Sequence, residues 1–159
     1  LLDLYRDEPL EALKKLDAAW PRLKKNFYLH VTVLRISALE ARCRAAMSAF
    51  RRGMGARYGQ IARADARRLE REGTPWSSAI AATLRAGLAS QAEMSERLRE
   101  AEAAFERADM LMHVQLLRRR RGALLGGDTR RSIGATTDQW AQDQGLSDLE
   151  GLSRVWVGF

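Results

Sequence analysis

The chain has 159 residues, a formal net charge of +7, 46% hydrophobic and 30% charged residues, three prolines and a single cysteine. This composition is typical of a folded protein and excludes a disordered tail or a disulfide framework. No apolar run approaches the roughly 20 residues that cross a bilayer, and no charged and then apolar leader follows Leu1. We therefore expect no membrane partner, no secretion signal and, with one lone cysteine, a cytoplasmic location.

Apolar residues recur at helical spacing along nearly the whole chain, so the sequence predicts an all-α fold of about eight helices and no strands. In chain order, the predicted helices span 7–20, 27–50, 56–72, 75–92, 94–108, 109–125, 128–144 and 147–156. Tight turns between them favour stacked antiparallel helix pairs, an α-solenoid. We expect residues 1–159 to form a single helical-repeat domain, the C-terminal fragment of a longer protein.

Capping residues and prolines set several of the predicted boundaries. Pro9 fits the first turn of the first helix, and Pro21 is expected to bend or end that helix. Thr74, followed by a proline, is a favourable helix start. Ser147 and Glu150 have capping-box spacing for the last helix.

The segment 27–34 allows an alternative. It is rich in β-branched and aromatic residues, which favour a strand. The helical pattern continues without a break to residue 50, and this continuity favours the helix.

A unit of 35 residues recurs in register along the second half of the chain. Gly87 recurs as Gly122, and Phe105 recurs as Trp140. Around these anchors the pattern is amphipathic helix, tight turn, amphipathic helix. We therefore expect the helices themselves to carry the function, as an interaction scaffold.

Small residues in these units carry a resemblance to a known repeat. Ala101, Phe105 and Ala108 have small–large–small spacing, and the glycines at 87 and 122 allow close backbone approach. This arrangement resembles the tetratricopeptide repeat, a helix pair of 34 residues. The resemblance implies a concave surface lined by the first helix of each pair. The usual Trp before each glycine and the usual Pro after Ala108 are missing.

A second resemblance covers the last third of the chain. The motifs that carry it are 122–128 (GALLGGD), Trp140, Gln144-Gly145 and the final Gly158-Phe159. They resemble the extreme C-terminal region of a group of large bacterial serine/threonine protein kinases that carry helical repeats behind the kinase domain. The resemblance implies a regulatory or partner-binding role. Arg130-Arg131 and Ala141 depart from the pattern of that group.

Arg118 to Arg121 form the densest basic run. Four consecutive helical residues encircle the helix axis, so the run does not form a single basic stripe. Arg121 is expected to point toward neighbouring helices and to pair with Glu102, Glu106 or Asp138. We expect internal salt bridges and solvated surface from the others, with phosphate or acidic-peptide binding as the alternative. The pair at 130 and 131 could extend a basic edge.

No pattern of catalytic, metal-binding or cofactor-binding residues is present in the sequence. His30 and His113 are far apart and are expected to be surface or packing residues, because one cysteine cannot complete a zinc site with them. Asp65 and Glu72 are expected to lie on polar faces as solvated carboxylates. We therefore expect no enzyme activity in this region, no metal and no cofactor.

The expected function is that of a non-catalytic protein–protein interaction or regulatory domain with a protein or peptide partner. Candidate partner-binding residues are Arg85, Gln91, Gln115, Arg118 and Arg119. The alternatives are nucleic-acid binding through arginine–phosphate contacts and self-association through the apolar ends Leu1, Leu2 and Leu4. Trp156 is expected to cap the last repeat.

Overall fold

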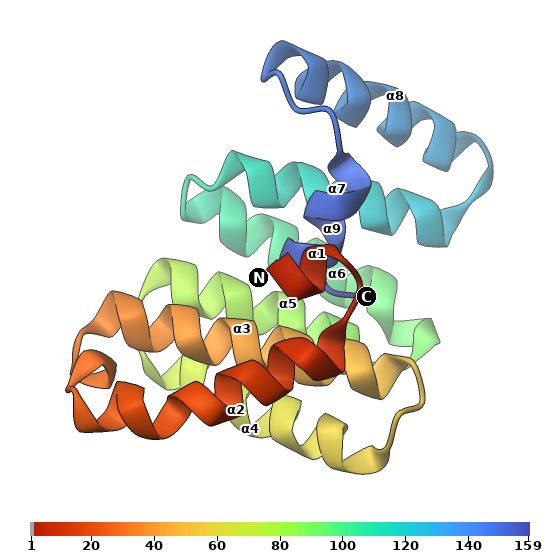
Figure 1. Cartoon of the computed structure of the whole chain (residues 1–159). Helices are drawn as coiled ribbons and strands as arrows, with labels where there is room; N and C mark the ends of the chain where they lie inside the picture. The colour runs from red at the N-terminus through yellow and green to blue at the C-terminus, as the bar shows by residue number, and fades with distance from the viewer. Residues whose placement is uncertain (1) are drawn as a thin grey trace.

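The computed structural model describes residues 2–159, and it contains no strand in that range (Figure 1). The elements are α1 (Leu2–Tyr5), α2 (Pro9–Lys25), the short 3-10 helix η1 (Tyr28–His30), α3 (Thr32–Arg51), α4 (Ala56–Arg71), α5 (Pro75–Leu88), α6 (Gln91–Arg107), α7 (Leu111–Leu125), α8 (Gly127–Asp143) and α9 (Leu149–Trp156). The predicted all-α fold of about eight helices is confirmed. The helix that the sequence did not predict is the four-residue α1.

The helices α2 to α8 pack mainly against their neighbours in the chain, whereas α9 contacts α1 and α7. The helices α3 and α4, α5 and α6, and α7 and α8 form adjacent pairs, and α3 also contacts α5 directly. Successive pairs therefore lie in a stack, which confirms the predicted arrangement (Figure 1).

The anchors of the 35-residue unit fall on corresponding helices. Gly87 lies in α5 and Gly122 in α7, whereas Phe105 lies in α6 and Trp140 in α8. The glycines meet different neighbours. A Cβ at position 122 would lie 3.2 Å from a side chain of α8, whereas one at position 87 would overlap α3 and the end of the chain.

Thr74 caps α5 as predicted. Its Oγ1 accepts a hydrogen bond from the Ser77 backbone N–H at 3.2 Å, and the Ser77 hydroxyl accepts one from the Thr74 N–H. At α9 the predicted capping box is wrong. Asp148, not Ser147, is the N-cap, and its carboxylate accepts a hydrogen bond from the Gly151 N–H at 2.8 Å. An aspartate caps as well as a serine, so the N-cap lies one residue later than predicted.

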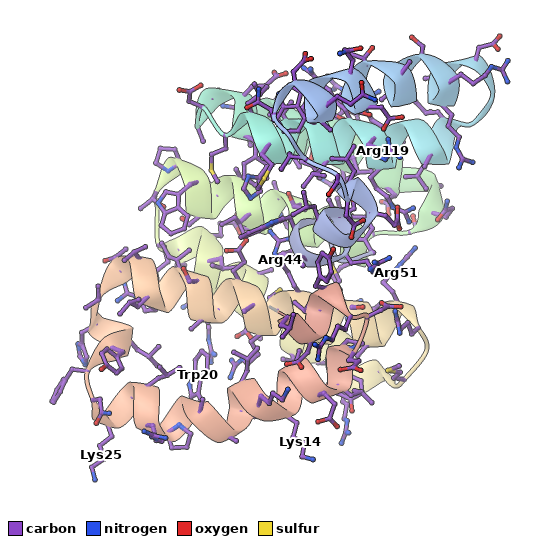
Figure 2. All side chains as sticks on the ribbon, turned by 45° about the horizontal axis from the view of Figure 1, so that its top comes forward. Lys14, Trp20, Lys25, Arg44, Arg51 and Arg119 are labelled. Carbon is purple, nitrogen blue, oxygen red and sulfur yellow. The ribbon has the colours of Figure 1, made fainter. Side chains whose placement is uncertain are left out.

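Pro21 does not end its helix, which was one of the two outcomes predicted for it, because α2 continues to Lys25. The preceding residue, Trp20, is labelled in Figure 2, and the guanidinium of Arg42 lies 4.0 Å from the centre of its ring, so this part of α2 is packed against α3.

The segment 27–34 forms neither the predicted continuous helix nor the alternative strand. Phe27 has a φ of 61°. This left-handed conformation is not that of a right-handed α-helix, so the helix cannot continue through Phe27. The short η1 follows, and α3 begins only at Thr32.

Two ion pairs, one of them at the fully buried Asp65 and one at the half-buried Glu72, join α3 to α4 and its C-terminal cap. Asp65 is fully buried, and each of its carboxylate oxygens accepts a hydrogen bond of 2.7 Å from Arg42. Glu72 accepts two hydrogen bonds of 2.6 Å from Arg35. The prediction that these acids are solvated on polar faces is therefore wrong. A buried carboxylate is stable only when it is paired in this way.

The two ends of the described chain meet, since α1 and α9 lie side by side in the middle of the molecule (Figure 1). The hydroxyl of Tyr5 donates a hydrogen bond to the Asp148 carboxylate. Arg154 Nε donates to the backbone carbonyl of Tyr5 at 3.2 Å. A Cβ at Gly151 would overlap the Tyr5 ring, so the glycine permits this close contact.

This contact buries part of the apolar end that was predicted to allow self-association. Leu4 is buried, whereas Leu2 is 60% exposed. Leu1 lies outside the described residues. One leucine of the predicted three is therefore seen at the surface.

Candidate functional site

The surface formed by α3, α5 and α7, the first helices of the three pairs, is filled by the end of the chain. A Cβ added at Gly87 of α5 would lie 2.5 Å from the Phe159 ring. The Trp156 ring lies 5.2 Å from that of His113 on α7 and 5.7 Å from the Arg44 guanidinium on α3. Trp156 therefore packs on α7 of the last pair and, at the same time, on α3 of the first pair.

His113 is a packing residue in this contact. Its ring stacks on Phe105 with 4.6 Å between the ring centres. Burial, and to a smaller extent the charge of Arg44, lower the pKa of His113 to about 4. The imidazole is therefore neutral at pH 7 and behaves as an aromatic side chain.

Beside α9 lies a cavity of about 720 Å³, where the beginning of α2, the end of α3, the α7–α8 hairpin and the last residues of the chain meet. Seven arginines line it: Arg51, Arg52, Arg119, Arg120, Arg130, Arg131 and Arg154. The acidic residues in the lining are Asp7, Asp138 and Glu150. We refer to it as the arginine cavity. Figure 2 shows Arg51 and Arg119 on the same side of the molecule.

Helix ends bring these arginines together. Arg51 is the last residue of α3, where a cation interacts favourably with the carbonyl end of the helix. Gly126 separates α7 from α8 and has a φ of 70°, a conformation that glycine adopts without strain. This tight turn places Arg130 of α8 beside the later part of α7.

Four of the seven arginines have a carboxylate partner. The pairs are Arg52 with Asp7, Arg119 with Asp138, Arg131 with Asp128, and Arg154 with Glu150 at 3.9 Å. Within residues 2–159, Arg51, Arg120 and Arg130 have no carboxylate within 4.0 Å. The cavity therefore holds more positive than negative charge.

Arg120 is the least compensated of the three. Its Nε is buried and has no hydrogen-bond partner among the described residues. Its guanidinium lies 5.6 Å from the centre of the Phe159 ring. Burial, and next the charge of Arg51, lower the pKa of Arg120 below its ordinary value, against the opposite effect of Glu150. An anion in the cavity would relieve this unfavourable environment.

Four of the five predicted partner-binding residues lie outside the cavity: Arg85, Gln91, Gln115 and Arg118. Arg85 is exposed and pairs with Glu70 of α4. Gln91 is the exposed first residue of α6. Gln115 is only 7% exposed, so it does not project toward a partner as predicted, because α7 turns this residue into the core.

The basic run on α7 divides between two environments. Arg118 pairs with Glu106 at 2.5 Å, away from the cavity. Arg121 pairs with Glu102 at 2.7 Å, which confirms one of its predicted partners. Arg119 is the predicted partner-binding residue that lines the cavity.

Arg51 and the distinct environment of Arg120 were not predicted from the sequence. The doublet at 51 and 52 stands just before a glycine turn, and a basic doublet at a helix end was the available signal. It did not show that residues near 51, 120 and 130 converge, because that depends on the stack.

The described residues contain no group of three or more His, Cys, Asp or Glu side chains placed to hold a metal ion. None of the helices in 2–159 is both long enough and apolar enough to pass through a bilayer. Comparisons of the chain with protein-family models, curated proteins and solved structures found no match.

Proposed function

We propose that this chain is a non-catalytic protein-interaction domain that binds an acidic segment of a partner protein in the arginine cavity. The observation that supports the proposal is the presence of Arg51, Arg120 and Arg130 in one cavity without carboxylate partners among the described residues. Guanidinium groups bind carboxylates through paired hydrogen bonds, so a cavity of this kind selects anionic ligands.

The shape of the cavity favours a short peptide over a nucleic acid. Its volume of about 720 Å³ is in the range of sites that enclose small ligands or a few residues. Single-stranded nucleic acids are usually bound along a groove with several aromatic side chains for base stacking. In the lining of this cavity the aromatic side chain is that of Phe159.

The wider context of the domain rests on sequence patterns. The tetratricopeptide-like repeat and the association with a bacterial serine/threonine kinase remain part of the proposal, as does the cytoplasmic location. In this view the stacked helices hold the arginines in place, and any chemistry belongs to another part of the polypeptide or to the partner.

A binding experiment with charge-matched variants tests the proposal. A fluorescent peptide of about 12 residues, rich in Glu and Asp, is titrated with the wild type and with the double variant Arg51→Gln/Arg130→Gln. Both residues are exposed, so the fold should be retained. We expect at least about a tenfold loss of affinity, since a charge-assisted hydrogen bond contributes roughly 1.5–3 kcal/mol.

The matched control is Arg97→Gln/Arg99→Gln, which removes the same charge from the exposed surface of α6. Its affinity should remain within about twofold of the wild type, because exposed charges act weakly over distance. An equal loss in both double variants would mean that only net charge binds the peptide. Tighter binding of a single-stranded oligonucleotide, falling by orders of magnitude between about 50 and 200 mM salt, would favour the nucleic-acid alternative.

A further inference from the structure

The unpaired arginines of the cavity come from three different elements. Arg51 ends α3, Arg120 lies in α7 and Arg130 lies in the first turns of α8. Arg51 lies close enough to Arg120 for its charge to lower the pKa of that arginine, and Arg130 lines the same cavity. A single compact group of high charge can neutralise neighbouring guanidinium groups together, whereas an extended run of glutamates spreads its charge along several residues.

The number of guanidinium groups also exceeds what one carboxylate can satisfy. A carboxylate carries one negative charge on two oxygens. A phosphomonoester carries about −1.5 to −2 at pH 7 on three strong acceptor oxygens. It can accept hydrogen bonds from several guanidinium groups at once, which is the geometry for which arginine is suited.

Other lining groups favour the same ligand. Ser48 and Ser153 place hydroxyl donors in the lining. The buried Arg120 Nε is a donor without a partner among residues 2–159. The nearby acids Asp7 and Asp138 are already paired with Arg52 and Arg119, and these pairs leave the other guanidinium groups free for an incoming anion.

We propose that the arginine cavity selects a phosphomonoester dianion, carried by a phosphorylated serine or threonine of the partner protein. This inference rests on the proposed function and specifies its ligand. The phosphoryl group lies among Arg51, Arg120 and Arg130, and the flanking residues of the partner occupy the rest of the cavity.

Calorimetry with three matched peptides tests this proposal. The peptides share one neutral sequence and carry Ser, Glu or phosphoserine at the central position. With the full chain, we expect the phosphoserine peptide to bind at least about tenfold more tightly than the Glu peptide, and the Ser peptide to show no binding. Inorganic phosphate should compete, but only at concentrations well above those of the phosphopeptide.

Variants then assign the binding to the cavity. The Arg51→Gln/Arg130→Gln protein should lose at least about tenfold in affinity for the phosphopeptide, and Arg97→Gln/Arg99→Gln should lose less than about twofold. Arg51→Lys keeps the charge but removes the planar fork, and it should also weaken binding severalfold. Circular dichroism of each variant verifies the fold.

The outcomes separate this inference from the proposed function. Equal, cavity-dependent affinity for the Glu and phosphoserine peptides would overturn the selectivity and leave the proposed function intact. No binding of these peptides or of the acidic peptide to the folded protein would overturn both. Inorganic phosphate binding as tightly as the phosphopeptide would assign the cavity to a small phosphate compound and overturn the assignment to a phosphorylated protein.

Discussion

Gly87 lies where α5, α3 and the end of the chain meet. A Cβ at this position would overlap Met47 of α3 and the ring of Phe159. We therefore expect Gly87→Ala to reduce the free energy of unfolding by roughly 1–3 kcal/mol, the usual cost of an extra group in a packed core. Urea unfolding followed by circular dichroism measures the change.

Gly134 provides the control, because it lies inside α8 and a Cβ there would meet no atom within 4 Å. Gly134→Ala should stabilise the protein by about 0.5–1 kcal/mol, because alanine favours a helix over glycine. If both substitutions stabilise the protein equally, Phe159 does not pack on α5 in solution.

His113 makes stability depend on pH. Its pKa falls from the ordinary 6.5 to about 4 in the folded state, mainly because burial disfavours the charged ring. The unfolded chain therefore binds a proton more readily than the folded chain. The contribution of the neutral ring to the free energy of unfolding is fully present above pH 6.5 and is lost as the pH falls toward 4. Between pH 7 and 4 the wild type should lose up to roughly 3 kcal/mol more than His113→Phe.

Urea unfolding at several pH values between 7 and 4 tests this difference. Other titrating groups contribute equally to both proteins, so the difference between the two curves reports His113. Parallel curves would show that position 113 is solvated or charged in the folded protein.

Individual buried charges were beyond sequence analysis. Arg44 has no exposed surface, and its guanidinium donates to Glu40 at 2.6 Å. Asp65 is equally buried and is held by Arg42. A charged residue in a sequence favours the surface. Arg44 is buried with a partner one turn earlier in the same helix, and Asp65 with a partner from the neighbouring helix; the sequence alone does not show that packing buries either pair.

At the scale of elements, the amphipathic pattern predicted α4 and α8 closely, because turn glycines mark their ends. The amphipathic pattern gave no correct prediction where a segment is too short or too irregular to repeat apolar residues at helical spacing. The four residues of α1 are too few to show a helical pattern. The helix boundary at Thr32 depends on the left-handed Phe27, which the composition of the segment does not reveal.

Trp156 carries the contacts of α9 with His113 on α7 and Arg44 on α3. Trp156→Ala should release α9 from α3 and α7, because it removes the ring that contacts His113 and Arg44. We expect the amides of 149–157 to exchange at least about tenfold faster with deuterium, while those of α4 and α6 keep their protection.

Leu125→Ala, at an exposed leucine at the end of α7, is the control and should leave the exchange of α9 unchanged. Unchanged exchange of 149–157 in Trp156→Ala would show that α9 is held by other contacts, such as those of Tyr5. Loss of protection throughout the chain would show that α9 is part of a single cooperative unit.

At the scale of the whole molecule, the fold was more predictable than the site. Local patterns predict helices, and tight turns predict that neighbours pack as pairs. The arginine cavity depends on contacts between distant segments, since Asp7, Arg51, Arg130 and Arg154 all line it. The meeting of α1 with α9 closes this arrangement, and no local pattern in the sequence indicates it.

The account depends on uncompensated arginines acting together as an anion site. The most direct measurement is an NMR titration that follows the arginine Nε–H resonances as the acidic peptide is added. Resonances of Arg51, Arg120 and Arg130 should shift together and saturate at one equivalent, whereas those of Arg97 and Arg99 on α6 should stay in place. Small shifts spread over all arginines, without saturation, would contradict the account.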